Sequence, residues 1–147
     1  MSIFCFWAYW IKKVFKVKLS SKDVGVFGEA IAANFLKKNK KLKILERNWI
    51  DPSGRVKNEI DIIAKDKDVL VFVEVKTRTE GGLVPGYYSV NTKKKEALLK
   101  VCKVYLRKKR KKHNYYRFDV LEVRLCQNYD YRVIHYTNVP LFPKHFA

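Results

Sequence analysis

The chain has 147 residues and 48% of them are hydrophobic, so it is long and apolar enough to bury the core of one domain and is not disordered as a whole. It carries 32 Lys and Arg against 14 Asp and Glu, and the formal net charge of +18 favours a polyanionic partner. The three cysteines, Cys5, Cys102 and Cys126, form no C-x-x-C pair, which argues against a disulfide framework and a zinc site. This pattern predicts a reducing, cytoplasmic location.

The N-terminal segment differs from the rest of the chain. Ile3 to Ile11 is almost entirely apolar, and a lysine-rich stretch follows it. Such a segment is too short to cross a bilayer, which takes about 20 residues, and it lacks the features of a signal peptide. Three interpretations stay open: a helix that packs on the domain or a partner, an appendage outside the fold, or an anchor at a membrane surface. We predict an extension over residues 1–21 and a domain over residues 22–147.

An amphipathic helix is predicted from about Asp23 to Lys38. Its apolar residues recur at spacings of three and four, at Val24, Phe27, Ile31 and Phe35. Glu29 lies roughly opposite this stripe, among alanines, which is unusual for a solvated helix face. Either its carboxylate is aimed at a neighbouring site, or it is a first-turn acid that the helix dipole favours. A short strand is predicted next, from Leu42 to Arg47.

A hairpin is predicted from two apolar runs, Glu59 to Ala64 and Val69 to Thr77, joined by the polar turn Lys65-Asp66-Lys67-Asp68. A turn centred between Asp66 and Lys67 would place Asp61 opposite Phe72 and Glu59 opposite Glu74. Asp61 and Glu74 would then be diagonal neighbours on one face. A slip of one residue would put them on opposite faces.

This hairpin predicts a metal site. Carboxylates such as Asp61 and Glu74 are the hard ligands that Mg²⁺ takes together with water and phosphate. The ammonium of Lys76, on the same face as Glu74, would hold the attacking water or stabilise charge on phosphorus. The alternative is a solvated edge hairpin in which Glu74 and Lys76 form a simple ion pair.

The second half of the chain is strongly basic. After a glycine-rich loop at 79–88, where Tyr87 and Tyr88 either stack on bases or pack, a helix is predicted from Asn91 or Thr92 to about Lys108. Twelve basic residues lie between Asn91 and Arg117, against one acid. Such a run is usually a solvated face, but its density and aromatic neighbours favour nucleic acid.

Two further strands are predicted, Tyr116 to Leu125 and Tyr131 to Thr137. Together the elements predict a mixed α/β sandwich, a sheet flanked by helices. Alternation along the first of these strands does not settle whether Asp119 lies near the metal site.

Five segments occur in an order typical of a known family: Gly25–Ala32, Ile44–Trp49, Glu59–Ala64, Leu70–Arg78 and Arg117–Val120. In these segments the chain resembles the bacterial YraN-like, endonuclease-like family of the PD-(D/E)XK nuclease superfamily. The resemblance runs from about Val24 to Val123 and implies a restriction-endonuclease-like fold.

The resemblance also implies site residues. Asp61, Glu74 and Glu29 would bind metal, and Lys76 would be the catalytic lysine. Lys94 would contact phosphate, or it would extend past Leu98 to solvent. The residues predicted to bind nucleic acid are Arg78, Lys94, Arg107, Lys108, Lys109, Arg110, Lys111 and Lys112.

The predicted function is hydrolysis of phosphodiester bonds with Mg²⁺ or Mn²⁺ and no small-molecule cofactor. DNA is the first candidate substrate, and RNA is the second. One alternative is a non-catalytic nucleic-acid-binding module on the same fold. Another is a basic interaction protein anchored by its aromatic N-terminus.

Overall fold

The computed structural model describes residues 20–79, 91–109, 115–126 and 130–142. These residues form two helices and five strands, whose order and bounds are α2 (Ser21–Lys38), β1 (Lys43–Ile50), β2 (Glu59–Asp66), β3 (Val69–Thr79), α3 (Thr92–Lys109), β4 (Tyr115–Leu125) and β5 (Tyr131–Tyr136). Each lies within a few residues of its predicted bounds. Most of the predicted extension, the loop with Tyr87 and Tyr88, and Arg110 to Lys112 lie outside the described residues.

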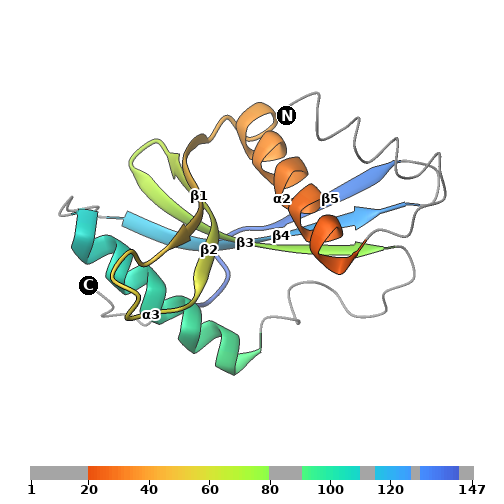
Figure 1. Ribbon diagram of the computed structural model, residues 1–147. Coiled ribbons are helices and arrows are strands. Elements are labelled where there is room, and N and C mark those ends of the chain that lie inside the picture. The colour runs from red at the N-terminus through yellow and green to blue at the C-terminus, as the bar shows by residue number, and fades with distance from the viewer. Residues whose placement is uncertain (1–19, 80–90, 110–114, 127–129, 143–147) are drawn as a thin grey trace.

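The strands form one sheet in the order β1-β2-β3-β4-β5. Neighbouring strands are antiparallel except β3 and β4, which run parallel from the pair Val69↔Tyr115 to the pair Thr79↔Leu125. A parallel pair needs a crossover, and α3 lies in the connection between these two strands. The helices α2 and α3 cover opposite faces of the sheet (Figure 1). The predicted mixed α/β fold is therefore confirmed.

Helix α2 begins at a polar cap and packs its apolar stripe on the sheet. The Ser20 hydroxyl accepts the backbone N–H of Asp23 at 3.2 Å, which satisfies one of the free donors at the helix start. Phe27 and Ile31 are buried in one core with Val73 of β3. This core holds the helix against the centre of the sheet.

Helix α3 is built in the same way on the other face. The Asn91 side chain accepts the backbone N–H of Lys94 at 2.9 Å and caps the helix, as the sequence predicts. Leu98 and Tyr105 pack in a core with Phe72 of β3 and Phe118 of β4. This core holds the helix against β3, the strand that carries Glu74.

The register of the β2–β3 hairpin differs from the predicted one by two residues. Asp66 pairs with Val69, and Ile63, rather than Asp61, pairs with Phe72. The turn is made by Lys67 and Asp68, and Lys67 has a φ of 52°, in the left-handed region that two-residue hairpin turns require. Because side chains alternate with a period of two, this shift does not exchange the faces of the strand.

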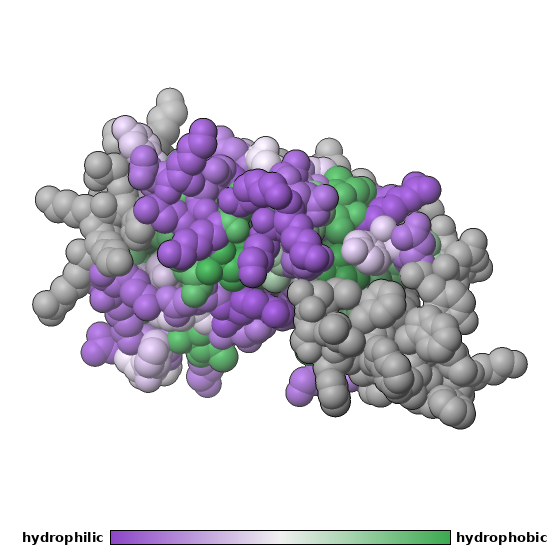
Figure 2. Space-filling view, turned by 90° about the horizontal axis from the view of Figure 1, so that it is seen from above, coloured by the Kyte–Doolittle hydropathy of each residue, from purple (hydrophilic) through white to green (hydrophobic). Residues whose placement is uncertain are grey.

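Among the described residues, no helix is long and apolar enough to cross a membrane. From the side of α2, hydrophilic residues cover most of the described surface and the apolar patches are small (Figure 2). Cys102 is buried in the core and Cys126 is half-buried, and both are free thiols.

Candidate active site

The alternation of side chains along β2 breaks at Asp61. Ile60 packs in the core on the α3 side, whereas Ile62 packs in the core on the α2 side. In a regular strand, residues two apart share a face. The adjoining strand β1 is irregular at the same level, because Asn48 has a φ of 51°. Asp61 therefore lies where the side chains of β2 switch from one face of the sheet to the other. Its own side chain is within reach of residues on both faces.

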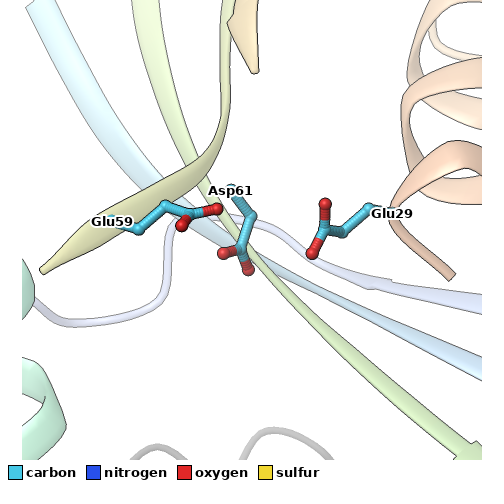
Figure 3. Close-up of side chains that lie close together, drawn as sticks. All are labelled: Glu29, Glu59 and Asp61. Carbon is cyan, nitrogen blue, oxygen red and sulfur yellow. The ribbon is translucent and has the colours of Figure 1, made fainter. Parts of the chain in front are cut away.

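Three carboxylates meet at this point. Oxygens of Glu29 from α2, and of Glu59 and Asp61 from β2, all lie within 4.8 Å of one another. The three side chains point toward a common space between helix and strand (Figure 3). Of these residues, the sequence predicted Glu29 and Asp61 as ligands and did not predict Glu59, which it placed opposite Glu74.

Asn48 bridges two of these acids. Its side-chain Nδ2 donates to Glu29 Oε2 and to Glu59 Oε1, each at 2.7 Å. Both bonds span elements that are far apart in the sequence. One neutral amide thus holds together two carboxylates that would otherwise repel each other.

The Asp61 carboxyl is in an unfavourable place for a negative charge. Burial and the nearby charge of Glu74 raise its pKa from 3.8 to about 7, although its Oδ2 accepts the backbone N–H of Val75 at 2.7 Å. The β2–β3 ladder runs from Asp66↔Val69 to Ile62↔Val73. Just beyond its end, the Asp61 carboxylate accepts the backbone N–H of Val75 in place of a carbonyl of β2. Asp61 is consequently fixed in position.

Glu74 joins the acidic cluster to two lysines. It is 2% exposed, and its Oε1 lies 2.7 Å from Lys76 Nζ and 3.3 Å from Lys94 Nζ. Its other oxygen, Oε2, is buried, and no described residue donates to it. Lys94 thus points inward at the start of α3, as predicted, and reaches Glu74.

Close packing of α2 on β3 brings Glu29 to the cluster. A Cβ added at Gly28 would overlap the Thr77 side chain, so only glycine allows this approach. Glu29 is the next residue along the helix. The predicted site residues Glu29, Asp61, Glu74 and Lys76 are therefore brought together, from three separate elements.

Some of the predicted nucleic-acid-binding residues form ion pairs within the protein, and others are exposed or half-buried. Lys108 Nζ lies 2.7 Å from the buried Asp51, and Lys109 Nζ lies 2.8 Å from Glu46. These pairs attach the end of α3 to β1 and to the loop that follows it. Arg107 is exposed, and Arg78 is half-buried near the end of β3.

Asp119 belongs to a different network. It is fully buried on β4 and is bonded by Arg117 Nε at 3.0 Å and His135 Nε2 at 2.9 Å. Arg117 also donates to Asp66, at 2.8 Å. These bonds connect β4 with β5 and with the end of β2, and Asp119 is not among the acids that meet at Asp61.

The donor set fits a hard divalent cation. Three carboxylates converge, the pKa of one is raised by its surroundings, and the neighbouring Glu74 has a buried oxygen to which no residue in the described part of the chain donates. A cation between these groups would offset the repulsion among them. Mg²⁺ and Mn²⁺ prefer such oxygen ligands.

The mixed sheet with one helix on each face is a restriction-endonuclease-like α/β core. Residues 28–123 match the uncharacterised protein family UPF0102. A UPF0102 protein of Clostridium botulinum strain 657 is 46% identical in an alignment of 121 positions, which covers 78% of this chain and 92% of the relative. One from Clostridium tetani strain Massachusetts is 44% identical over 112 residues, 75% of this chain and 85% of the relative. The chain belongs to the UPF0102 family, the YraN-like family that its motifs predicted.

Proposed function

We propose that the protein is a metal-dependent nuclease that hydrolyses phosphodiester bonds in DNA, with RNA as the second candidate substrate. One observation carries this proposal: the carboxylates of Glu29, Glu59 and Asp61 converge beside a buried Glu74 that is bonded to Lys76. Acids and an ammonium in this arrangement supply both ligands for a cation and a donor for a phosphate oxygen.

The metal would be held by Glu29, Glu59, Asp61 and Glu74. When bound, Mg²⁺ or Mn²⁺ would place positive charge beside the phosphate oxygens and make a neighbouring water more acidic. Burial and the nearby charge of Glu74 raise the pKa of Asp61, and a bound cation would favour its ionised form.

Lys76 would act on the reacting phosphate. Its side chain is 28% exposed, so the ammonium touches both Glu74 and the solvent from which a substrate arrives. It would donate to the attacking water or to the phosphate oxygens as their charge increases in the transition state. Glu74 fixes the ammonium through the bond at 2.7 Å.

Helix α3 would bind the substrate backbone. Lys100, Lys103 and Arg107 lie on its exposed side and form no ion pair with any described residue. Lys94, in the first turn of the same helix, lies 3.3 Å from Glu74. A nucleic-acid backbone that follows α3 would therefore reach the site. This basic face alone also fits a binding module without catalysis, which is the second candidate.

Cleavage of single-stranded, duplex, flap and junction substrates separates the two candidates. We expect products with Mg²⁺ or Mn²⁺, none with EDTA, and suppression by Ca²⁺, which tolerates looser geometry. Asp61→Ala should abolish cleavage, whereas Asp68→Ala, in the exposed β2–β3 turn, should leave it unchanged. A wild-type protein that cuts nothing and binds neither Mg²⁺ nor Mn²⁺ would support the binding module instead.

A further inference from the structure

Three arginines lie side by side across three strands. Arg78 of β3 pairs in register with Arg124 of β4, and Arg124 pairs with Arg132 of β5. Paired residues of neighbouring strands share a face. Two residues before Arg78 on the same strand comes Lys76, so the row and the candidate site lie on one face of the sheet.

This face is the one that α3 covers in part. Phe72 of β3 and Val120 of β4 lie an even number of residues from the row on their strands, so they share its face, and they pack in the core beneath the helix. The first residue of α3 is Thr92, and Lys94 is already beside Glu74. The arginines therefore lie farther along β3 and β4 than the strand positions that α3 covers.

The row has more positive charge than the described residues neutralise. Arg124 Nε donates to the fully buried Glu122 at 2.6 Å. Arg78 and Arg132 form no ion pair with any described residue. Like charges directly opposite each other in a sheet are destabilising. An anion that lies across the three guanidinium groups would remove this cost.

The arrangement also suits a nucleic-acid strand. Arg124 donates to Glu122 through Nε, and its two terminal nitrogens form no hydrogen bond with a described residue, which leaves them to donate to a phosphate. From strand geometry, the row begins about 7 Å from Lys76 and extends about 10 Å farther, toward the edge strand β5. This places it within reach of phosphates next to the one that Lys76 would contact.

We propose that Arg78, Arg124 and Arg132 form a phosphate-binding row for the nucleic-acid strand as it leaves the active site toward β5. The proposal rests on the proposed function, because it takes the ligand to be the substrate backbone. The row would position the scissile phosphate through its neighbours and would not take part in the chemistry.

The test is nucleic-acid affinity as a function of salt, measured in EDTA so that no cleavage occurs. The variant is Arg78→Gln with Arg132→Gln, because replacing Arg124 would leave the buried Glu122 without its cation. The control is Lys37→Gln with Lys38→Gln, which makes the same change in net charge on exposed residues of α2, on the opposite face of the sheet.

We expect the row variant to bind roughly tenfold more weakly, with a salt dependence that is shallower by about 1.4 to 1.8 in log–log slope, and the control to resemble wild type. If the double variant does not fold, Arg132→Gln alone should show about half of this change in slope. Equal slopes for the row variant and the control would overturn the proposal.

The outcome is independent of catalysis. A protein that loses binding in the row variant but never cleaves would contradict the nuclease and keep the row. A protein that cleaves, but whose row variant binds like the control, would contradict the row and keep the nuclease.

Discussion

Asn48 shows how much of the candidate site depends on one neutral side chain. It donates to Glu29 and Glu59, which lie on different elements, and its own backbone is left-handed. Asparagine tolerates this conformation better than most residues. No local pattern predicts these contacts, because they join positions that are 19 and 11 residues from Asn48 in the sequence.

The first prediction therefore concerns Asn48→Gly, which removes the amide and keeps the backbone conformation accessible. We expect Mn²⁺ affinity, measured by calorimetry, to fall about 10- to 100-fold, as for other residues that orient metal ligands. Asn138→Gly is the matched control, because Asn138 has a φ of 52° and its backbone N–H donates to Asp119, which is outside the cluster of Glu29, Glu59 and Asp61. Equal affinities in the two variants would show that the bridge does not orient the ligands.

The second prediction uses the pKa of Asp61. Because this pKa rises from 3.8 in the unfolded chain to about 7 in the fold, the folded state holds a proton that the unfolded state releases. Stability then falls as the pH rises from about 4 to about 7, by about 1.4 kcal/mol per pH unit. Asp61→Asn removes this loss and still offers an oxygen to Val75.

Urea unfolding in EDTA at pH 5 and pH 8 measures the effect. The advantage of Asp61→Asn over wild type should be larger at pH 8 than at pH 5. Saturating Mn²⁺ should stabilise wild type more than the variant at pH 8, because ligands that bind only the folded state add to its stability. An advantage that does not change with pH would rule out the raised pKa.

At the scale of elements, hydrophobic spacing predicted the helices and strands because each buries one regular stripe or face. The irregular features were not predictable in this way. The β2–β3 turn contains neither Gly nor Asn, so no residue marked its centre, and the register was off by two. The break in alternation at Asp61 coincides with the left-handed backbone of Asn48 in the neighbouring strand, and Glu59 lies beside Glu29 rather than opposite Glu74.

The third prediction tests the contact between α2 and β3. Gly28→Ala places a methyl group into the Thr77 side chain, so we expect the free energy of unfolding to fall by about 1 to 3 kcal/mol. Cleavage should also decrease, because Glu29 moves with the helix. Gly25→Ala, on the same helix with open space around it, should instead stabilise by about 0.4 to 1 kcal/mol. Similar effects at both positions would contradict the close approach.

The fourth prediction separates two kinds of lysine on α3. Lys108→Met leaves the buried Asp51 without the cation that lowers its pKa, so the variant should be less stable than wild type near pH 7. That loss should shrink as the pH falls below the ordinary pKa of an aspartate, because the unpaired acid is then protonated. Lys103 is exposed and has no ion pair with a described residue, so Lys103→Met should change stability by no more than about 0.5 kcal/mol.

Nucleic-acid affinity, measured as a function of salt, should rank these two variants in the opposite order from stability. Lys103→Met should reduce the salt dependence of affinity by about one contact, or about 0.9 in log–log slope on duplex DNA. Lys108→Met should reduce it less, because its charge is already paired. The opposite order would assign the paired end of α3, rather than its exposed face, to binding.

At the scale of the whole molecule, the net charge of +18 conceals an uneven distribution. Acids gather where α2, β2 and β3 meet, and they hold Lys76 and Lys94 there. The basic face of α3 and the arginine row lead away from this point in different directions. The molecule thus combines a small acidic site with long basic surfaces on either side, which suits a reaction at one phosphate of an extended polyanion.

The most direct test of this account is single-turnover cleavage by Lys76→Ala, with nucleic-acid affinity and Mn²⁺ affinity measured on the same preparation. Lys43→Ala, exposed at the start of β1, is the control. We predict a cleavage rate at least about 100-fold lower for Lys76→Ala, with both affinities within about fivefold of wild type, because the ammonium acts mainly in the transition state. A Lys76→Ala protein that cleaves as fast as wild type would contradict the assignment of the site.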